Sequence, residues 1–147
     1  MIGLGIPGLN IRLEVAFPAP PDRVFAALTD ELDAWWPVSL RRLQGRMSLE
    51  ARLGSDMVEI GPNGEGTCWA RVDCRVPGRN LHLSGHFCVD NVVAGRILYD
   101  LAETPDGGCR LTLTHLAIGP VSVDHALNRR KQWSETLEGP LRRHLAG

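Results

Sequence analysis

The sequence predicts an α+β fold in which a curved antiparallel sheet wraps around a long C-terminal helix. Three observations carry this prediction. Residues 9–17 and 45–117 alternate between apolar and polar side chains, which is the period of half-buried strands. Turn sequences recur about every 8–15 residues in the second segment with no helical stretch between them, which favours an antiparallel meander. Residues 122–145 change to the helical period.

The N-terminal part predicts one strand and two short helices. Residues 9–17 form the strand, because their alternation gives one apolar and one charged face. The prolines before Asp22 begin a helix, since proline is well accepted in a first turn. Thr29 can cap a second short helix that runs to about Trp35. Pro37 stops it, because a residue before proline avoids the helical conformation.

The middle of the chain predicts about six strands of one meander. Within residues 66–76, Ala70 and Val72 share one face, whereas Trp69 and Arg71 share the other. We therefore expect Trp69 on the solvent-facing side of the sheet. Glycines within two of the segments indicate bends or bulges. The expected strands span residues 47–53, 57–60, 66–76, 81–89, 92–102 and 109–116.

The C-terminal segment, residues 122–145, predicts a long amphipathic helix. Its apolar residues form one stripe at about 100° per residue. Gly139 and Pro140 lie inside it and should bend it or loosen its last turn, because proline lacks a backbone donor. Since one helix cannot cover both faces of a sheet, we expect the sheet to curve around it. The stripe comprises Val123, Ala126, Leu127, Trp133, Leu137, Leu141 and Leu145.

Composition narrows the classes of partner. The 147 residues include 16 Lys plus Arg and 17 Asp plus Glu, for a formal net charge of −1. This length suits one domain over residues 1–147, and a near-zero charge predicts no nucleic-acid partner. No apolar run approaches the roughly 20 residues of a membrane span. The N-terminus lacks the basic start of a secretory signal, so we expect a cytoplasmic protein.

We expect neither a metal nor a cofactor. The four cysteines form no CxxC pair, and no Cys/His group has structural-zinc spacing. Residues 3–8 match GxGxxG literally. A dinucleotide site, however, needs a helix after the glycines, and here a strand follows. We therefore expect residues 1–8 to form a flexible N-terminal arm.

A family resemblance rests on three segments. The stretch PPDRVFAALTD at residues 20–30, followed by Trp35-Trp36-Pro37, resembles the opening of the START-related helix-grip superfamily (SRPBCC). More narrowly, it resembles the branch similar to the activator of heat-shock-protein-90 ATPase. GGCRLTLTH at residues 107–115 looks like the penultimate element of that branch, and Trp133 lies in what looks like its closing helix. The resemblance implies a helix-grip fold with about six or seven strands.

The resemblance also implies a cavity between sheet and helix that binds apolar or amphipathic ligands. Some relatives are aromatase-cyclases, whereas others are lipid carriers, stress-response proteins or chaperone-associated proteins. For this chain it implies a hydrophobic-ligand-binding protein of unknown physiological role. The fold and the ligand class are therefore expectations that the structure can test.

Polar residues on apolar faces are the sharpest functional signal. His115 has the parity of Leu113 and should point inward, either as a hydrogen-bonded core residue or as a cavity group that orients a ligand or transfers protons. Tyr99 shares the parity of Ile97, and its phenol needs a partner if it is buried. Arg130 lies near the centre of the helical stripe. It either pairs or reaches solvent at the cavity mouth, or it anchors an anionic ligand group.

The tryptophans complete the candidate site. At a helix–sheet mouth, large rings often serve both as core and as cavity wall. No catalytic residue can be assigned from the sequence. The candidate ligand-binding residues are Trp35, Trp36, Tyr99, His115, Arg130, Trp133 and Leu137.

The sequence thus predicts binding of a small hydrophobic or amphipathic molecule, with homodimer formation left open. One alternative is a polyketide aromatase/cyclase-like enzyme that uses His115, Tyr99 and Arg130. The other is a chaperone-associated or regulatory module that binds a protein through the outer sheet face. Ligand binding predicts an inner cavity of about 300 Å³ or more. Protein interaction predicts a filled core and an exposed apolar patch, and catalysis predicts two cavity groups that reach one ligand position.

Overall fold

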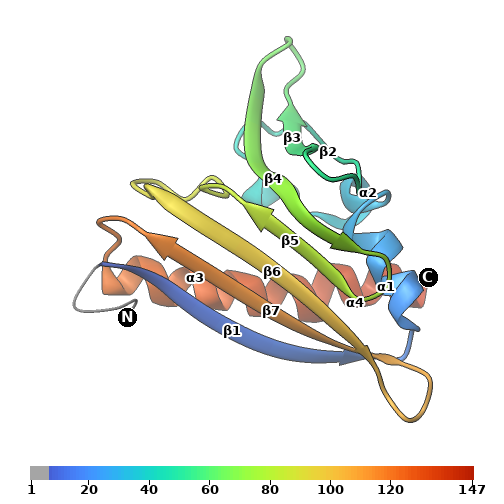
Figure 1. Cartoon of the computed structure of the whole chain (residues 1–147). Coiled ribbons are helices and arrows are strands. Elements are labelled where there is room, and N and C mark those ends of the chain that lie inside the picture. Colours follow the sequence, from blue (N-terminus) through green and yellow to red (C-terminus); the bar gives the residue numbers. More distant parts are fainter. Residues whose placement is uncertain (1–6) are drawn as a thin grey trace.

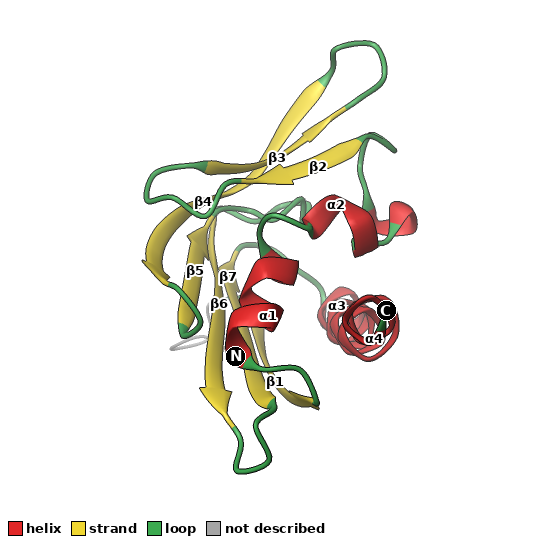
Figure 2. Cartoon of the chain, turned by 90° about the vertical axis from the view of Figure 1, so that its right-hand side faces the viewer, coloured by secondary structure: helices red, strands yellow, loops and turns green. Residues whose placement is uncertain are grey.

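A computed structural model describes residues 7–147 of the chain. Among these residues, seven strands form one antiparallel sheet in the order β1-β7-β6-β5-β4-β3-β2 (Figure 1). Viewed along the C-terminal helix, the sheet and α2 surround that helix on two sides (Figure 2). This is the α+β helix-grip architecture that the sequence predicts. The elements are β1 (Gly8–Phe17), α1 (Pro21–Leu28), α2 (Leu32–Trp35), η1 (Val38–Leu40), β2 (Arg46–Leu49), β3 (Asp56–Ile60), β4 (Gly66–Val76), β5 (Asn80–Ser84), β6 (Ala94–Glu103), β7 (Cys109–Ile118), α3 (Val123–Thr136), η2 (Leu137–Leu141) and α4 (Arg142–Ala146).

The meander runs from β2 to β7 in chain order, and β1 returns to pair with β7. That pairing extends from Gly8 opposite Ile118 to Phe17 opposite Cys109. Gly8, which the sequence places in a flexible arm, is thus the first residue of a strand. Most of the GxGxxG match lies outside the described residues. None of the helices within residues 7–147 has the length and apolar character needed to span a bilayer.

A β-bulge in β4 reverses one prediction from the sequence. Met57 pairs with Ala70 and Val58 pairs with Cys68, so Trp69 is the extra residue. Trp69 and Ala70 are both buried, with 1% and 2% of their surfaces exposed, whereas Cys68 is exposed. The expectation that Trp69 faces solvent is therefore wrong. Strict alternation applies only on each side of the bulge, and the bulge turns the indole into the core.

The predicted strand 81–89 ends early. β5 stops at Ser84, and the segment from Gly85 to Val93 is a loop. Gly85 passes so close to β4 that an added Cβ would lie 2.6 Å from the Trp69 carbonyl oxygen, so only glycine fits there. The Phe87 side chain of this loop is fully buried in the core.

The C-terminal helix is continuous but changes its pitch. Ser122 caps α3, because its Oγ accepts a hydrogen bond from the His125 backbone N–H at 3.1 Å. Pro140 lies in the π-helical segment η2, which confirms the predicted loosening near the C-terminus. This wider segment still directs its leucines, Leu137 and Leu141, into the core.

The start of the predicted apolar stripe is wrong. Val123 and Leu127 are 76% and 61% exposed, and Arg130 is also exposed. The buried side of the helix passes through Trp133 and Thr136 instead. The physical reason is that the first turns of α3 lie beside the edge strand β1 and border a groove rather than the core.

Glu59 orders the chain between η1 and β2. It is fully buried and accepts hydrogen bonds from the backbone N–H groups of Arg42, Leu43 and Gly45 at 2.9, 2.7 and 3.0 Å. Its fourth donor is Trp69 Nε1 at 3.2 Å. Burial alone would raise the pKa of this carboxyl, but these hydrogen bonds outweigh burial and hold the pKa below its usual value. Glu59 thereby fixes the Trp69 ring.

Arg41 plays the matching role at Trp36. Its side chain is buried and donates to the Trp36 carbonyl oxygen from Nε at 3.1 Å and from Nη2 at 2.6 Å. It also forms an ion pair with Asp33 at 2.8 Å and donates to the Gly45 carbonyl oxygen. A buried guanidinium is tolerated only when it is paired and hydrogen-bonded. This network sets the position of Trp36 over the sheet.

Candidate ligand-binding site

An aromatic cluster fills the space between the sheet and α3. Trp133 is its centre, and Phe87 stacks on it at 5.4 Å with 24° between the ring planes. The rings of Trp36, Tyr99 and His115 lie 5.9, 6.1 and 6.0 Å from the ring of Trp133. The structure therefore brings together four of the residues that the sequence singles out, from four separate elements of the chain.

Two further predicted residues lie at the edge of this cluster. Trp35 packs edge-on against Trp36 at 5.5 Å and donates from Nε1 to the Ala27 carbonyl oxygen at 2.6 Å. It therefore joins α2 to α1. Leu137 is fully buried in the same core. Both residues support the site from behind rather than line a free space within it.

Phe87 is the residue of this site that sequence reasoning misses. It contacts the rings of Trp36, Trp69 and His115 at 5.7, 5.0 and 5.8 Å, in addition to Trp133. Its parity with Leu83 is the signal that could identify it. The predicted strand 81–89 already contained that parity. In the structure β5 ends at Ser84, and a loop carries Phe87 inward instead.

His115 is a neutral hydrogen-bond donor in this environment. It is fully buried, and its Nδ1 accepts the Trp133 Nε1–H at 3.0 Å. Burial, with a contribution from the charge of Arg129, lowers the pKa of His115 to about 3. A neutral imidazole whose Nδ1 accepts carries its proton on Nε2. This Nε2–H has no partner among residues 7–147.

Two other donors beside His115 are also unpaired. Within the part of the chain that the structure describes, Trp36 Nε1 and Arg129 Nε are buried without a hydrogen-bond partner. Both residues line one cavity together with Phe87 and Trp133. The free space is about 10 Å³, enough for about one water molecule. Each unpaired buried donor costs about 1–3 kcal/mol.

The arginine that faces the core is Arg129 rather than Arg130. Arg129 is half-buried, and burial lowers the pKa of its guanidinium. No ion pair to it occurs among residues 7–147. Arg130 is exposed on the other flank of α3, which corrects its expected place at the centre of the stripe. The helix is rotated toward Arg129 because Trp133 and Thr136 are its deeply buried residues.

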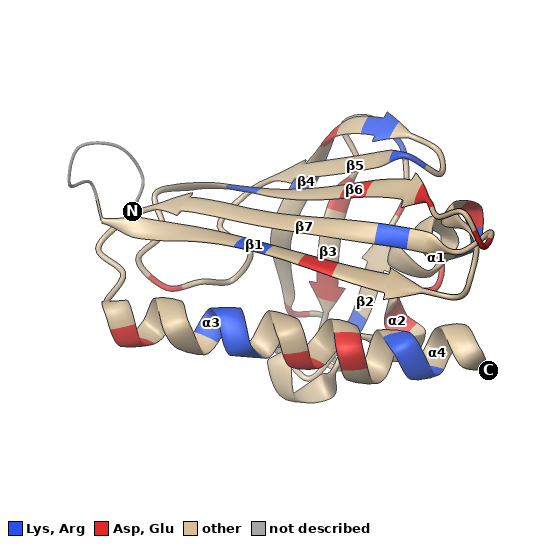
Figure 3. Cartoon of the chain, turned by 90° about the horizontal axis from the view of Figure 1, so that it is seen from below, with Lys and Arg blue, Asp and Glu red and all other residues tan. Residues whose placement is uncertain are grey.

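A separate groove of about 540 Å³ lies between the start of β1 and the first turns of α3. Figure 3 shows β1 and α3 running side by side. The walls are mainly aliphatic, and Arg130 stands at the edge without an ion pair among the described residues. The expected inner cavity of about 300 Å³ is thus occupied by rings, and space for a ligand lies beside them. The lining residues are Pro7, Gly8, Asn10, Ile11, Val121, Ser122, Val123, Ala126, Leu127 and Arg130.

The loop that carries Phe87 is strained. Phe87 and Cys88 have φ angles of 53° and 52°, in the left-handed region that costs non-glycine residues roughly 1–2 kcal/mol each. Arg42 holds the loop, since it donates to the Cys88 carbonyl oxygen at 3.1 Å and pairs with Asp90 at 2.9 Å. Aromatic packing and these polar contacts keep Phe87 in place against the strain.

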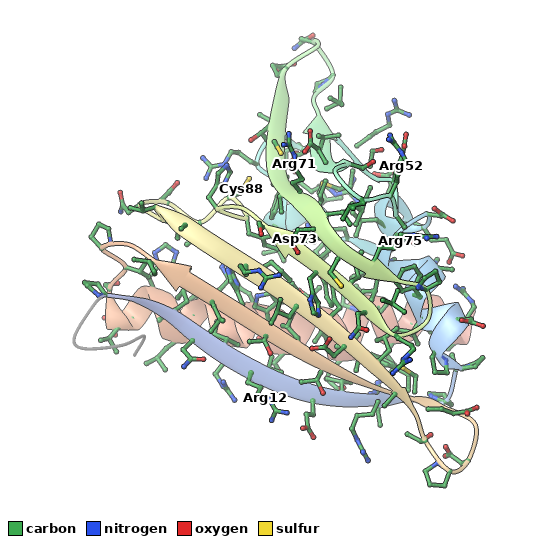
Figure 4. The ribbon with its side chains drawn as sticks, in the orientation of Figure 1. Arg12, Arg52, Arg71, Asp73, Arg75 and Cys88 are labelled. Atoms are coloured by element: carbon green, nitrogen blue, oxygen red, sulfur yellow. The ribbon has the colours of Figure 1, made fainter. Side chains whose placement is uncertain are left out.

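The outer face of the sheet carries paired charges. Arg71, Asp73 and Arg75 project from β4 toward the viewer in Figure 4. Asp73 pairs with Arg96 at 2.9 Å, and Arg71 pairs with Asp56 at 3.0 Å. This region is polar, whereas docking of a protein partner through the outer face would call for an apolar patch. The most exposed apolar side chains beside the groove, Val123 and Leu127, lie at the other side of the molecule.

Comparison with known proteins shows the family of the chain. Residues 18–146 match the family model described as activator of Hsp90 ATPase homolog 1-like protein. The chain belongs to this family. The match spans strands β2–β7 and the C-terminal helical segment, which carry the aromatic cluster, and begins directly after β1. It therefore confirms the branch that the sequence resembles. A search of curated protein sequences gives no significant match.

Solved structures share the fold of this Hsp90-activator-like chain at low identity. Protein MLL2253 from Mesorhizobium loti is 15% identical, with a TM-score of 0.72 over 93% of this chain and 96% of that one. The Aha1 dimer from Colwellia psychrerythraea is 20% identical, with a TM-score of 0.67 over 88% and 91%. DynU16, described as a putative protein in the dynemicin biosynthetic locus, is 20% identical, with a TM-score of 0.69 over 95% of this chain and 48% of that one.

Proposed function

We propose that this protein binds a small amphipathic molecule, with the apolar part in the groove between β1 and α3 and an acidic group at Arg130. The observation that carries the proposal is the groove itself, whose volume of about 540 Å³ lies within the usual range of about 300–1,000 Å³ for ligand sites. Its aliphatic walls supply contact area, and the few polar groups at its edge can orient a ligand.

The exposed aliphatic residues support this choice. Val123 and Leu127 leave 76% and 61% of their surfaces in water, although both line the groove. Covering such surface with an alkyl chain releases about 0.8 kcal/mol for each methylene buried. Arg130 can hold the acidic end, with Asn10 and Ser122 nearby as further hydrogen-bonding groups.

Binding fits the chemistry of the site better than proton transfer does. A cyclase-like enzyme that used His115 as a base would need a free imidazole lone pair. Here Nδ1 accepts a hydrogen bond from Trp133, and Nε2 carries the proton. With a pKa of about 3, His115 stays neutral at pH 7 and serves as a donor.

The groove is tested by calorimetric titration with octanoate, decanoate and dodecanoate and with the matching alcohols. Affinity is expected to rise about fourfold for each added methylene until the groove is filled. Arg130→Met is expected to weaken binding of the carboxylates by about tenfold and to leave that of the alcohols unchanged. Leu127→Ser should weaken binding of both series.

Lys131→Met is the matched control, because Lys131 is an exposed cation on the same helix, paired with Glu135 at 3.8 Å. Equal effects of Arg130→Met and Lys131→Met on carboxylate binding would contradict an anchoring role for Arg130. Affinity independent of chain length would contradict the groove as the apolar site. A cytoplasmic location stays a prediction. So does a homodimer, which is the state in which the Aha1 neighbour is described, and sedimentation velocity would measure it.

A further inference from the structure

A second site lies among the rings, on a different flank of α3 from the groove. The walls of this small cavity come from Trp36 after α2, from Phe87 in the β5–β6 loop, and from Arg129 and Trp133 on α3. Successive helical residues point about 100° apart, so Arg129 faces this cavity while Arg130 faces the groove. The two sites therefore share no lining residue, and one can fail without the other.

Two of the groups that line this cavity are unpaired hydrogen-bond donors. Trp36 Nε1–H and Arg129 Nε–H are buried, and neither has an acceptor in the part of the chain described. A third unpaired donor, His115 Nε2–H, lies outside the lining, on a ring that packs against Phe87 and Trp133. Trp36 and His115 are 3% and 0% exposed, so bulk water does not satisfy them. Buried donors in folded proteins are almost always paired. Gln132 and Thr136 also line the cavity, but neither accepts a hydrogen bond from these two donors. Two buried donors that the lining leaves unpaired indicate that their acceptor comes from a bound molecule.

The charge of the missing molecule follows from Arg129. This half-buried cation has no ion pair among residues 7–147, and its neighbour Asp90 is held by Arg42 at 2.9 Å. Asp90 acts on the charge of Arg129 only through space. The cavity therefore carries a positive charge with which no carboxylate of the described chain forms an ion pair. A single carboxylate supplies both the opposite charge and the acceptor oxygens that planar N–H donors require.

We propose that this cavity binds the carboxylate of a small aromatic acid. Its oxygens accept hydrogen bonds from Trp36 Nε1 and Arg129 Nε. The aromatic body of the ligand stacks on Trp133 in the place that Phe87 occupies here. The present free space of about 10 Å³ holds about one water molecule, so Phe87 must withdraw for the acid to enter.

The β5–β6 loop is suited to release Phe87. Phe87 and Cys88 both adopt left-handed backbone angles, and such strain favours departure from the present conformation. The Phe87 ring is parallel to Trp133 within 24°, which is the geometry that a flat aromatic ligand would reproduce. Phe87 is thus a side chain of the protein that occupies the place of the ligand's ring.

The experiment uses benzoate as the probe and toluene as its uncharged analogue, followed by ¹H–¹⁵N spectra of the tryptophan indoles in the full-length chain. The Trp36 signal is assigned with Trp36→Phe. Benzoate is expected to shift the Trp36 indole signal downfield, whereas toluene is expected to leave it in place. Phe87→Ala, which vacates the ring position, should bind benzoate about tenfold more tightly than the native protein does.

Arg129→Met in the Phe87→Ala background should weaken benzoate binding about tenfold or more, and Lys131→Met should not change it. If Phe87→Ala does not fold, Phe87→Leu vacates part of the same space and keeps the comparison. An unmoved Trp36 signal at saturating benzoate, in native protein and Phe87 variants alike, would overturn the proposal and leave a cavity for water only. Equal benzoate affinity in Arg129→Met and Lys131→Met would overturn it as well. Decanoate titration of Arg130→Met reports on the groove alone. A negative result in that titration therefore does not affect the conclusion from benzoate binding.

Discussion

Acidification from pH 7 to pH 5 is expected to destabilise the protein by about 2 kcal/mol through His115. In the folded state, burial lowers the pKa of this histidine to about 3, whereas in the unfolded chain it is about 6.5. Below pH 6.5 the unfolded state therefore binds a proton that the folded state does not. Linkage then lowers the free energy of unfolding by up to 1.36 kcal/mol for each pH unit. Stability is full above pH 6.5 and is lost progressively toward pH 3.

The assay is urea unfolding of the native protein and His115→Gln at pH 7 and pH 5. Glutamine can still accept the Trp133 Nε1–H and does not titrate. The stability difference between the two proteins is expected to change by about 2 kcal/mol between the two pH values. Carboxyls whose pKa is lowered, such as Glu59, titrate below this window. A difference that is the same at both pH values would refute the burial argument. If the variant does not fold, the His115 ring protons of the native protein should keep their chemical shifts from pH 7 to pH 5.

Two further predictions concern the aromatic cluster. Trp133→Ala should destabilise the protein by about 3–5 kcal/mol, because the Trp133 ring contacts four other rings and donates a hydrogen bond to His115. This loss lowers Tm by roughly 6–20 °C for a chain of this size. A loss below about 1 kcal/mol in thermal or urea unfolding would contradict the central position of Trp133. Trp69→Ala should lower the free energy of unfolding by a similar amount. Cys68→Ala, one residue away but exposed, should change it by less than about 0.5 kcal/mol. A larger loss for Cys68→Ala than for Trp69→Ala would mean that β4 has no bulge at this position.

Local periodicity predicts the fold and two members of the aromatic cluster, because parity is reliable inside regular strands. Tyr99 and His115 lie within long, regularly paired strands, and both point inward as the alternation predicts. Trp36 and Trp133 were identified by their ring type and family resemblance, and the structure brings them together. The π-helical turn at Pro140 also follows from the sequence, because a missing N–H has a local effect.

The remaining features depend on contacts that the local sequence does not contain. The bulge at Trp69 is set by how β4 pairs with β3 and by the Glu59 carboxylate that receives the indole N–H. Helix rotation decides whether Arg129 or Arg130 faces the core, and it is set by the packing of Trp133 on the sheet. A shift of one residue moves a helical side chain by about 100°, so a small error in the stripe assigned the inner place to the wrong arginine.

The contrast between Arg41 and Arg129 shows why Arg129 needs an acceptor from a bound molecule. Arg41 is buried, and Arg129 is half-buried with its Nε out of contact with solvent. Arg41 meets the carbonyl oxygens of Asp33, Trp36 and Gly45 and the Asp33 carboxylate, all within 3.1 Å. Arg129 meets no acceptor among the described residues, and Trp36 Nε1 beside it is equally unpaired. The fold of residues 7–147 supplies acceptors for Arg41 and none for Arg129, whose Nε shares a cavity with the unpaired Trp36 Nε1. This is the polarity of a site completed by an anion. The donors of this cavity therefore support a bound acid more strongly than its present volume argues against one, because Phe87, held in a strained loop, sets that volume.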